Sequence, residues 1–205
     1  MSEPPLPDRK WRRLDGFDYR SRLPYFVTLC TEGRRPILGS IAHDKIRLSQ
    51  RGRIVKNCWM EIPQHFDHVQ LDAWVVMPNH VHGILCWTGD VGATHASSAN
   101  SAKGGPARGS LGAVIGAYKS AVSRLINEIR PGAGTNFWQR NYYDHIIRTP
   151  AAFDAIRRYI MTNTANWIGD EHNSNAFRPV TLPDWILTLY PPADDACVAP
   201  TENTI

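Results

Sequence analysis

The stretch HVQLDAWVVMPNHVHGILCW at residues 68–87 decides the fold class of this chain. It contains two apolar segments, 68–77 and 80–87, separated only by Pro78 and Asn79. Proline and asparagine are typical of tight turns, and two strand-like segments with so short a connection predict an antiparallel hairpin. We therefore expect a sheet built around this hairpin.

Upstream of the hairpin, the sequence predicts one further strand and one helix. Residues 25–30 (YFVTLC) are β-branched and aromatic and are closed by Glu32 and Gly33, which indicates a buried strand. From residue 44 to about residue 62 the apolar side chains recur at helical spacing, with Lys and Arg on the other faces. Pro63 should end or interrupt that helix.

Downstream, the clearest helix follows Ser110, a good N-cap, and its apolar residues recur with a 3.6-residue period from Leu111 to Ile129. Residues 137–148 (FWQRNYYDHIIR) indicate a last strand or extended segment. Thr149 and Pro150 then provide an N-cap followed by proline at the first position of a helix that should run to about Trp167.

These elements give the order strand, helix, strand, strand, helix, strand, helix. The prediction is an α+β fold with a ferredoxin-like βαββαβ antiparallel sheet, helices on one face, and an added C-terminal helix. We expect one domain over residues 17–168. Residues 1–16 should form a flexible basic arm, residues 89–110 a mobile surface loop, and residues 169–205 an irregular proline-containing tail. This layout does not fix a function, since it carries many activities.

Composition excludes several classes of protein. The 205 residues include no apolar stretch near the roughly 20 that cross a bilayer, and the N-terminus lacks the apolar core of a secretory signal, so we expect a cytoplasmic protein without a membrane partner. Four cysteines without paired spacing do not indicate a disulfide framework or a zinc ribbon. The net charge of +4, with seven Trp and seven Tyr, is compatible with a polyanionic partner. No protein partner is implied.

Two histidines of the hairpin could hold a metal ion. His80 and His82 are two residues apart in a predicted strand, so both imidazoles should lie on one face. The alternative is that the pair only makes hydrogen bonds on a half-buried face.

The last helix offers a second pair. Tyr159 and Asn163 are four residues apart and should project from the same face. A phenol is a poor nucleophile unless the scissile phosphate is polarised or a base removes its proton. A divalent cation held by His80, His82 and the Asn163 carbonyl could supply that polarisation. The alternative for Tyr159 is an aromatic side chain that packs its helix against the core.

Three sequence elements together, PNHVH at 78–82, WQRNYYDHIIR at 138–148 and YIMTN at 159–163, resemble the Y1 tyrosine transposases of the IS200/IS605 type, and among them the REP-associated tyrosine transposases. The likeness runs from about Phe17 to Trp167. It implies a single-strand DNA nuclease and strand transferase of the HUH class. His80, His82 and Asn163 would be the ligands of Mg²⁺ or Mn²⁺, and Tyr159 would form a 5′-phosphotyrosine, with single-stranded or hairpin DNA of the REP type as substrate.

The sequence signals for DNA-contacting residues are less specific than those for the metal ligands and the nucleophile. The resemblance suggests Trp138 and Arg140, and Tyr143 could stack on a base. Basic character alone nominates four further phosphate contacts, for each of which an ordinary solvated surface is an equal alternative: Arg12, Arg13, Lys119 and Arg124.

Two other functions remain open at this level. One is a nucleic-acid-binding module that has lost catalysis and acts as a regulator. The other is a metal-dependent hydrolase that uses water in place of Tyr159. The family includes dimers in which the partner's helix completes the site, so both a monomer and a homodimer are compatible with the sequence.

Overall fold

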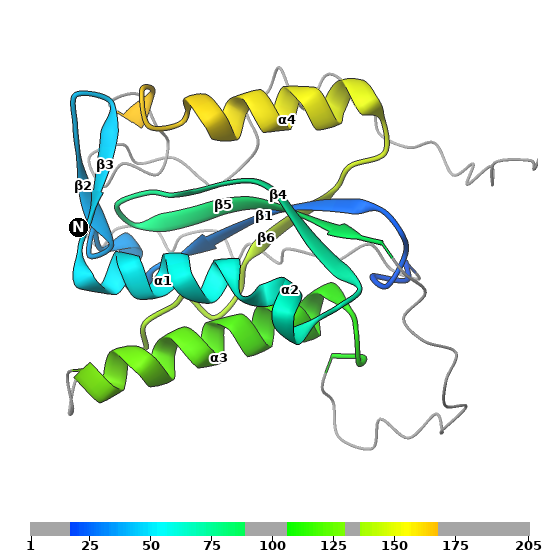
Figure 1. The fold of residues 1–205 in the computed structure, drawn as a ribbon, viewed down its shortest axis with the longest axis horizontal. Helices are drawn as coiled ribbons and strands as arrows, with labels where there is room; N and C mark the ends of the chain where they lie inside the picture. Colours follow the sequence, from blue (N-terminus) through cyan, green and yellow to red (C-terminus); the bar gives the residue numbers. More distant parts are fainter. Residues whose placement is uncertain (1–16, 89–105, 130–135, 168–205) are drawn as a thin grey trace, which may run out of the picture.

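The computed structural model describes residues 17–88, 106–129 and 136–167. The expected basic arm, most of the expected 89–110 loop and the expected C-terminal tail lie outside the described residues. The described chain forms the following elements in order: β1 (Pro24–Cys30), a short 3-10 turn η1 (Glu32–Arg34), β2 (Gly39–Ala42), β3 (Lys45–Leu48), α1 (Gln50–Met60), α2 (Ile62–His65), β4 (Val69–Val76), β5 (His80–Trp87), α3 (Leu111–Ile129), β6 (Tyr143–Ile146) and α4 (Pro150–Thr162) (Figure 1).

The central sheet has four strands in the order β4-β5-β1-β6, and every neighbouring pair is antiparallel. The predicted hairpin is confirmed as β4 and β5, joined at Pro78 and Asn79. β5 is almost entirely buried because it lies between two strands and is covered on both faces. The mixed α+β fold with an antiparallel sheet agrees with the expectation from the sequence.

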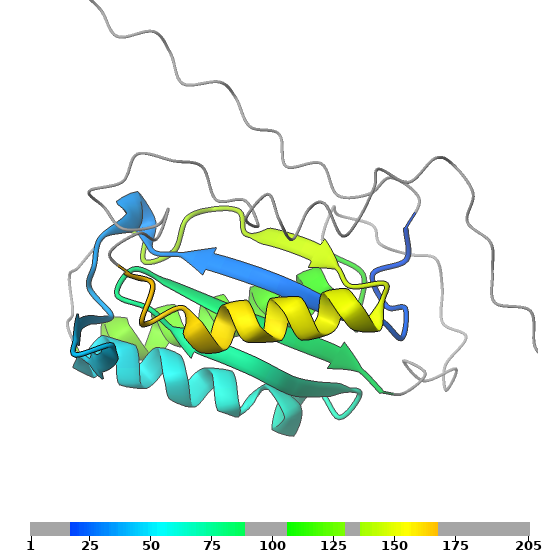
Figure 2. The ribbon, with the colours of Figure 1, turned by 90° about the horizontal axis from the view of Figure 1, so that it is seen from above.

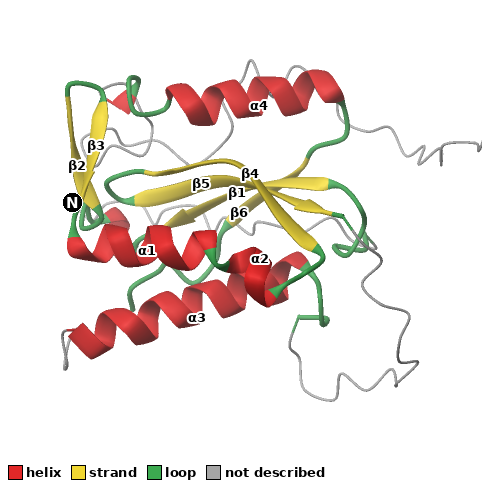
Figure 3. Ribbon diagram, viewed as in Figure 1, coloured by secondary structure: helices red, strands yellow, loops and turns green. Residues whose placement is uncertain are grey.

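The helices lie in separate layers on the two faces of the sheet. α1 and α3 cover one face and α4 covers the other, as Figures 1 and 3 show. Successive side chains of β5 point to opposite faces of the sheet, so the strand contributes residues to the core on each face. Val81 and Leu85 join the larger core with α1 and α3, whereas Ile84 joins a smaller core with Phe26 and Ile156 beneath α4.

Gly83 lets α1 approach the sheet closely. A Cβ atom at this position would lie 2.2 Å from Cζ2 of Trp59, a fully buried side chain of α1. The indole therefore occupies the space that a side chain at residue 83 would need.

The prediction of a helix from residue 44 is wrong at its start. Residues 39–48 form a separate antiparallel hairpin, β2 and β3, and α1 begins at Gln50. Its N-cap is Ser49, whose hydroxyl accepts a hydrogen bond from the Gly52 amide at 3.1 Å. Residues 45–48 alternate exposed and half-buried side chains, and this period of two was masked by the helical pattern that follows.

The other element ends differ from the sequence interpretation in smaller ways. Of the expected strand 137–148, only Tyr143–Ile146 pairs with β1, and Trp138 adds an isolated bridge to Thr31. The last helix ends at Thr162 rather than near Trp167. The Thr149 cap is confirmed by the bond that its side chain accepts from the Ala152 amide.

Gly109 and Ser110, at the end of the expected loop, are buried, whereas residues 106–108 are exposed. The indole nitrogen of Trp87 donates to the Gly109 carbonyl at 3.0 Å, and the Leu111 amide donates to the Tyr19 carbonyl at 3.1 Å. Among the described residues, no helix combines the length and apolar character that a bilayer crossing needs.

Candidate active site

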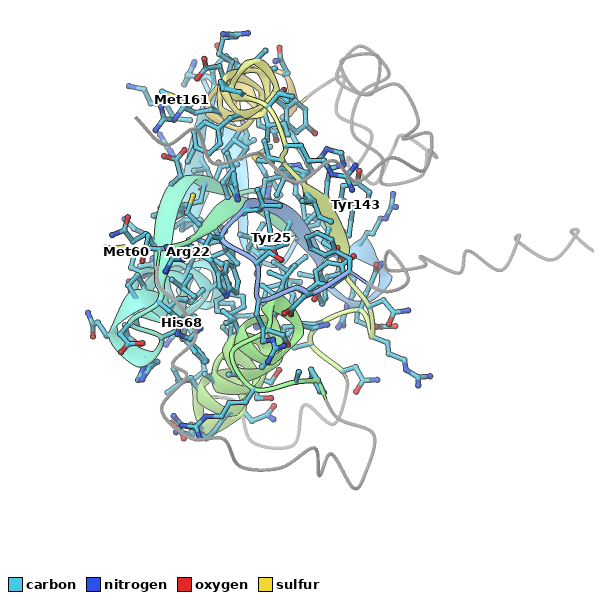
Figure 4. All side chains as sticks on the ribbon, turned by 90° about the vertical axis from the view of Figure 1, so that its right-hand side faces the viewer. Arg22, Tyr25, Met60, His68, Tyr143 and Met161 are labelled. Atoms are coloured by element: carbon cyan, nitrogen blue, oxygen red, sulfur yellow. The ribbon has the colours of Figure 1, made fainter. Side chains whose placement is uncertain are left out.

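His80 and His82 lie on the face of the sheet that α4 covers. The two rings are buried, with 0% and 1% of their surface exposed, and their centroids are 4.4 Å apart. The period of two along β5 therefore places both imidazoles together, as the sequence predicts. Figure 4 views the layers end on, with α4 above the sheet, Met161 on α4 and Tyr143 on β6.

The tautomer of His80 follows from its neighbour Asn79. The Asn79 amide nitrogen donates to the Arg34 carbonyl at 3.1 Å, and a carbonyl can only accept. The Asn79 oxygen therefore faces His80, where it lies 2.8 Å from Nδ1. Because that oxygen also only accepts, Nδ1 carries the hydrogen and Nε2 keeps its lone pair.

His82 is held from two sides. Its Nδ1 lies 2.8 Å from the Thr28 hydroxyl on β1, directly across the strand pair, and its ring stacks on Phe26 with centroids 5.3 Å apart. Its Nε2 lies 3.3 Å from the hydroxyl of Tyr159. The phenol of α4 and the imidazole of β5 are thus in direct contact although 77 residues separate them.

Asn163 and Trp167 extend this contact along the end of α4. Tyr159 meets His82 with ring centroids 5.3 Å apart, and Trp167 meets His80 at 6.1 Å. Asn163 lies midway between these two aromatic residues in the chain and is only 2% exposed. The last turn of α4 and the residues that follow it therefore contact the histidine pair at two points, and Asn163, the C-cap of α4, lies between these points in the chain.

The donor set fits a divalent cation. The Oδ1 atom of Asn163 is buried and has no hydrogen-bond partner, which is costly unless something else binds it. Among the described residues there is no cluster of three or more His, Cys, Asp or Glu side chains, so a cation here would be held by His80, His82 and this amide oxygen. Two imidazoles and one oxygen suit Mn²⁺, and the hard oxygen also suits Mg²⁺.

An ion pair links α4 to β4 at the surface of the protein. The guanidinium of Arg157 binds the carboxylate of Asp72 through two hydrogen bonds of 2.9 and 2.5 Å, and it lies 5.3 Å from the ring centre of Phe153. Asp72 belongs to the irregularity in the β4–β5 register between Leu71 and Trp74. Because Arg157 precedes Tyr159 by two residues, this pair helps to set where the phenol lies.

Two of the expected DNA contacts have structural roles instead. Trp138 is only 5% exposed and packs against Phe137 and Tyr118, so its ring is not available for stacking on a base. The ammonium of Lys119 donates to the carbonyls of Gln139 and Arg140 at 2.6 and 3.1 Å, and burial lowers its pKa. Lys119 thereby holds the segment before β6 rather than presenting its charge to solvent.

The remaining expected contacts differ in their distance from the histidines. Arg140 is exposed. The backbone N–H of the preceding residue, Gln139, donates to the backbone carbonyl of Cys30, and Cys30 pairs with His80 across β1 and β5. Tyr143 is half-buried on the site face, with its ring 6.1 Å from that of Phe26. Arg124 is exposed on α3, on the other face of the sheet, and pairs with Glu128. Arg12 and Arg13 lie outside the described residues.

Sequence reasoning missed Thr28 and Asn79, the two residues that hold the histidine rings. Asn79 was interpreted only as part of a turn, and its position directly before His80 was the available signal. No sequence signal identifies Thr28, because it comes next to His82 only through the pairing of β1 with β5.

Comparison with known proteins bears on the family and the fold of this chain. No protein-family model matches the chain. An uncharacterized protein of Haemophilus influenzae is 34% identical over 170 residues, covering 80% of this chain and 92% of that protein. A solved structure of a REP-associated tyrosine transposase bound to a REP hairpin has a TM-score of 0.52 at 18% identity, covering 82% of this chain and 74% of that chain.

A second solved structure, of a candidate transposase from Deinococcus radiodurans, is 19% identical with a TM-score of 0.42, over 73% of this chain and 95% of that chain. A score at that level is too low to establish a common fold. The resemblance to the Y1 transposases is confirmed for the fold by the REP-associated enzyme. This chain belongs to the same family as the Haemophilus influenzae protein, and its fold is that of the REP-associated tyrosine transposases.

Proposed function

We propose that the protein is a transposase that nicks and rejoins single-stranded DNA through Tyr159. The observation that carries this proposal is the contact between the Tyr159 hydroxyl and Nε2 of His82 at 3.3 Å, with the His80 ring beside it. A phenol held against a pair of buried histidines is suited to phosphoryl transfer, because the same residues can bind a cation that offsets charge on the phosphate.

In the proposed reaction, the Tyr159 oxygen attacks a backbone phosphorus and displaces the 3′ oxygen. One oxygen–phosphorus bond forms and one breaks, and the proton that the phenol loses is balanced by the proton that the 3′ hydroxyl gains. The products are a 5′-phosphotyrosine and a free 3′ end, and attack by another 3′ hydroxyl reverses the step. A Mg²⁺ or Mn²⁺ ion at His80, His82 and Asn163 would supply polarisation of the phosphate.

The protein surroundings contribute orientation. Thr28 and Asn79 hold the two rings through their Nδ1 atoms, so both Nε2 atoms are directed away from the strand backbone. Ile156 and Ile160 pack α4 against the sheet beside Phe26 and Ile84, and the Arg157 ion pair with Asp72 adds a contact to β4. Together these contacts hold Tyr159 beside His82. Fixed geometry of this kind lowers the entropic cost of bringing nucleophile and phosphate together.

Hairpin DNA of the REP type is the proposed substrate. The solved transposase with the similar fold is bound to such a hairpin, and the net charge of +4 favours association with a polyanion. Arg140 and Tyr143 are the proposed DNA contacts nearest the histidines.

The test uses hairpin DNA from repeats beside the gene, Mn²⁺, and three proteins: wild type, Tyr159→Phe and Tyr142→Phe. Tyr142 is a matched control because its ring packs in the larger core under the opposite face of the sheet. We expect a covalent protein–DNA band on a denaturing gel with wild type and Tyr142→Phe only, while all three proteins bind the hairpin.

Other outcomes separate the competing functions. If wild type binds the hairpin but no protein forms the covalent band, the protein is a binding module without this chemistry. If Tyr159→Phe still cleaves the DNA, water is the nucleophile and the role of Tyr159 is refuted.

A further inference from the structure

The unexpected hairpin of β2 and β3 carries a concentration of positive charge. Residues 32–53, which include this hairpin and its connections, contain six Lys and Arg but only two Asp and Glu. Their net charge of +4 equals that of the whole chain, so the rest of the sequence is neutral in total. The basic patch consists of four exposed residues: Arg35, Lys45, Arg47 and Arg53.

This patch presents its charge to solvent. In the β2–β3 register, Lys45 and Arg47 face the same side as their partners Ala42 and Ser40, while Ile46 and Leu48 lie half-buried on the other side. The guanidinium groups of Arg35 and Arg53 donate to backbone carbonyls, which orients them without neutralising them. Among the ion pairs within the described part of the chain, none includes a residue of the patch.

Hydrogen bonds join the patch to the turn that carries the histidines. The Leu38 amide, directly before β2, donates to the Pro78 carbonyl at 2.9 Å, and the Asn79 side chain donates to the Arg34 carbonyl. Figures 1 and 2 both place the hairpin beside the segment that follows α4. Trp167, the last described residue of that segment, contacts the His80 ring with centroids 6.1 Å apart. The basic patch therefore borders the end of the sheet at which Tyr159, His80 and His82 come together.

Close backbone packing holds the hairpin against the start of α1. Gly52 at the start of α1 packs so closely on the preceding connection that a Cβ atom there would lie 2.0 Å from the Leu38 carbonyl oxygen. The three non-glycine residues with positive φ among the described residues all lie here: Arg34, His43 and Asp44, at 52°, 51° and 57°. His43 and Asp44 are the two central residues of the β2–β3 turn, where positive φ at both positions matches the twist of the paired strands, so the turn adds to the definition of the hairpin.

From these observations we infer that the basic patch binds the phosphate backbone of the DNA strand next to the scissile phosphate. The inference rests on the proposed function and adds to it a surface that holds the strand beside the site. Contacts between Lys or Arg and backbone phosphates are the same for every base sequence. The patch therefore contributes affinity and position, not sequence recognition. A fixed hairpin keeps these cations at a constant distance from Tyr159.

The test compares two variants that each remove two positive charges. Lys45→Ala/Arg47→Ala removes half of the patch. Arg108→Ala/Arg148→Ala removes two exposed cations at the opposite end of β1, where the Leu111 amide meets the Tyr19 carbonyl and the Ile147 amide meets the Pro24 carbonyl. Neither cation takes part in an ion pair with a residue that the structure describes. All four side chains are exposed, so both variants should fold, and circular dichroism melting checks this.

Binding of a fluorescent oligothymidylate of about 20 nucleotides is measured by anisotropy over a series of salt concentrations, without metal. We expect the patch variant to lose affinity by about 10-fold and its log–log salt slope to become shallower by about 1.4, since each single-strand phosphate contact contributes about 0.7. The control variant should bind within about 2-fold of wild type. Equal losses for both variants, or no loss for the patch variant, would overturn the inference.

The covalent-adduct assay separates this result from the proposed function. If wild type forms the adduct but the patch variant binds oligothymidylate like wild type, the patch proposal fails while the nicking function stands. If wild type forms no adduct but the patch variant alone loses binding, the patch is a DNA surface on a protein without the proposed chemistry.

Discussion

The amide oxygen of Asn79 lies 2.8 Å from Nδ1 of His80, while the amide nitrogen of the same side chain donates to the Arg34 carbonyl. Asn79 is only 1% exposed, so both bonds are shielded from water. One side chain therefore joins the turn after β1 to a histidine of the candidate active site and selects the tautomer of that histidine.

Asn79→Ala should weaken Mn²⁺ binding by about 10- to 100-fold, because His80 loses the acceptor that keeps the hydrogen on Nδ1 and the lone pair on Nε2. Asn79→Asp keeps an acceptor at this place and should retain more of the affinity. Isothermal titration with Mn²⁺ measures both variants. Unchanged affinity in Asn79→Ala would show that the hydrogen bond does not prepare a metal ligand.

Asn163→Leu should stabilise the metal-free protein yet remove its response to Mn²⁺. The buried Oδ1 atom has no partner, and an unsatisfied buried acceptor costs about 1 to 3 kcal/mol. Melting curves with and without Mn²⁺ measure both effects, and the exposed Asn166 replaced by Leu is the control, which should keep the metal response. A loss of metal-free stability in Asn163→Leu would contradict the role assigned to this oxygen.

Stability should fall as the pH drops from about 6.5 to about 4 because of His145. Burial, and then the charge of Arg148, lower the pKa of His145 from 6.5 to about 4. Below pH 6.5 the unfolded chain binds a proton that the folded protein does not, so the free energy of unfolding decreases by about 1 to 3 kcal/mol over this range and is unaffected above it.

Urea unfolding of wild type and His145→Gln across this pH range tests that linkage. The variant should lose less stability on acidification than wild type. Parallel profiles for wild type and His145→Gln would exclude His145 as the source.

Two glycine-to-alanine replacements should have opposite effects. Gly83→Ala places a methyl group against the buried Trp59 ring and should lower the free energy of unfolding by about 1 to 3 kcal/mol. Gly116→Ala, on the exposed side of α3 with no atom within 4 Å, should raise it by about 0.5 to 1 kcal/mol. Denaturant titration measures both, and a neutral Gly83→Ala would mean that α1 can shift away from β5 at little cost.

Local patterns determined much of this protein directly from its sequence. The β4–β5 hairpin, the pairing of His80 with His82 on one face and the Thr149 cap depend on residues that are close together in the chain. Periods of 2.0 and 3.6 residues, turn pairs and caps are properties of short segments, so they can be predicted without knowledge of the remaining fold.

Only the tertiary structure decided which residues surround the histidines. Thr28 reaches His82 through strand pairing across 54 residues, and Tyr159 reaches it through the packing of α4 across 77. Trp138 is a core residue instead of a DNA contact for the same reason, because its burial depends on α3 and on the segment before β6. β3 falls within the predicted helix and β2 has no prediction, because contacts of Leu38 and Gly52, not local periodicity, hold this hairpin in place.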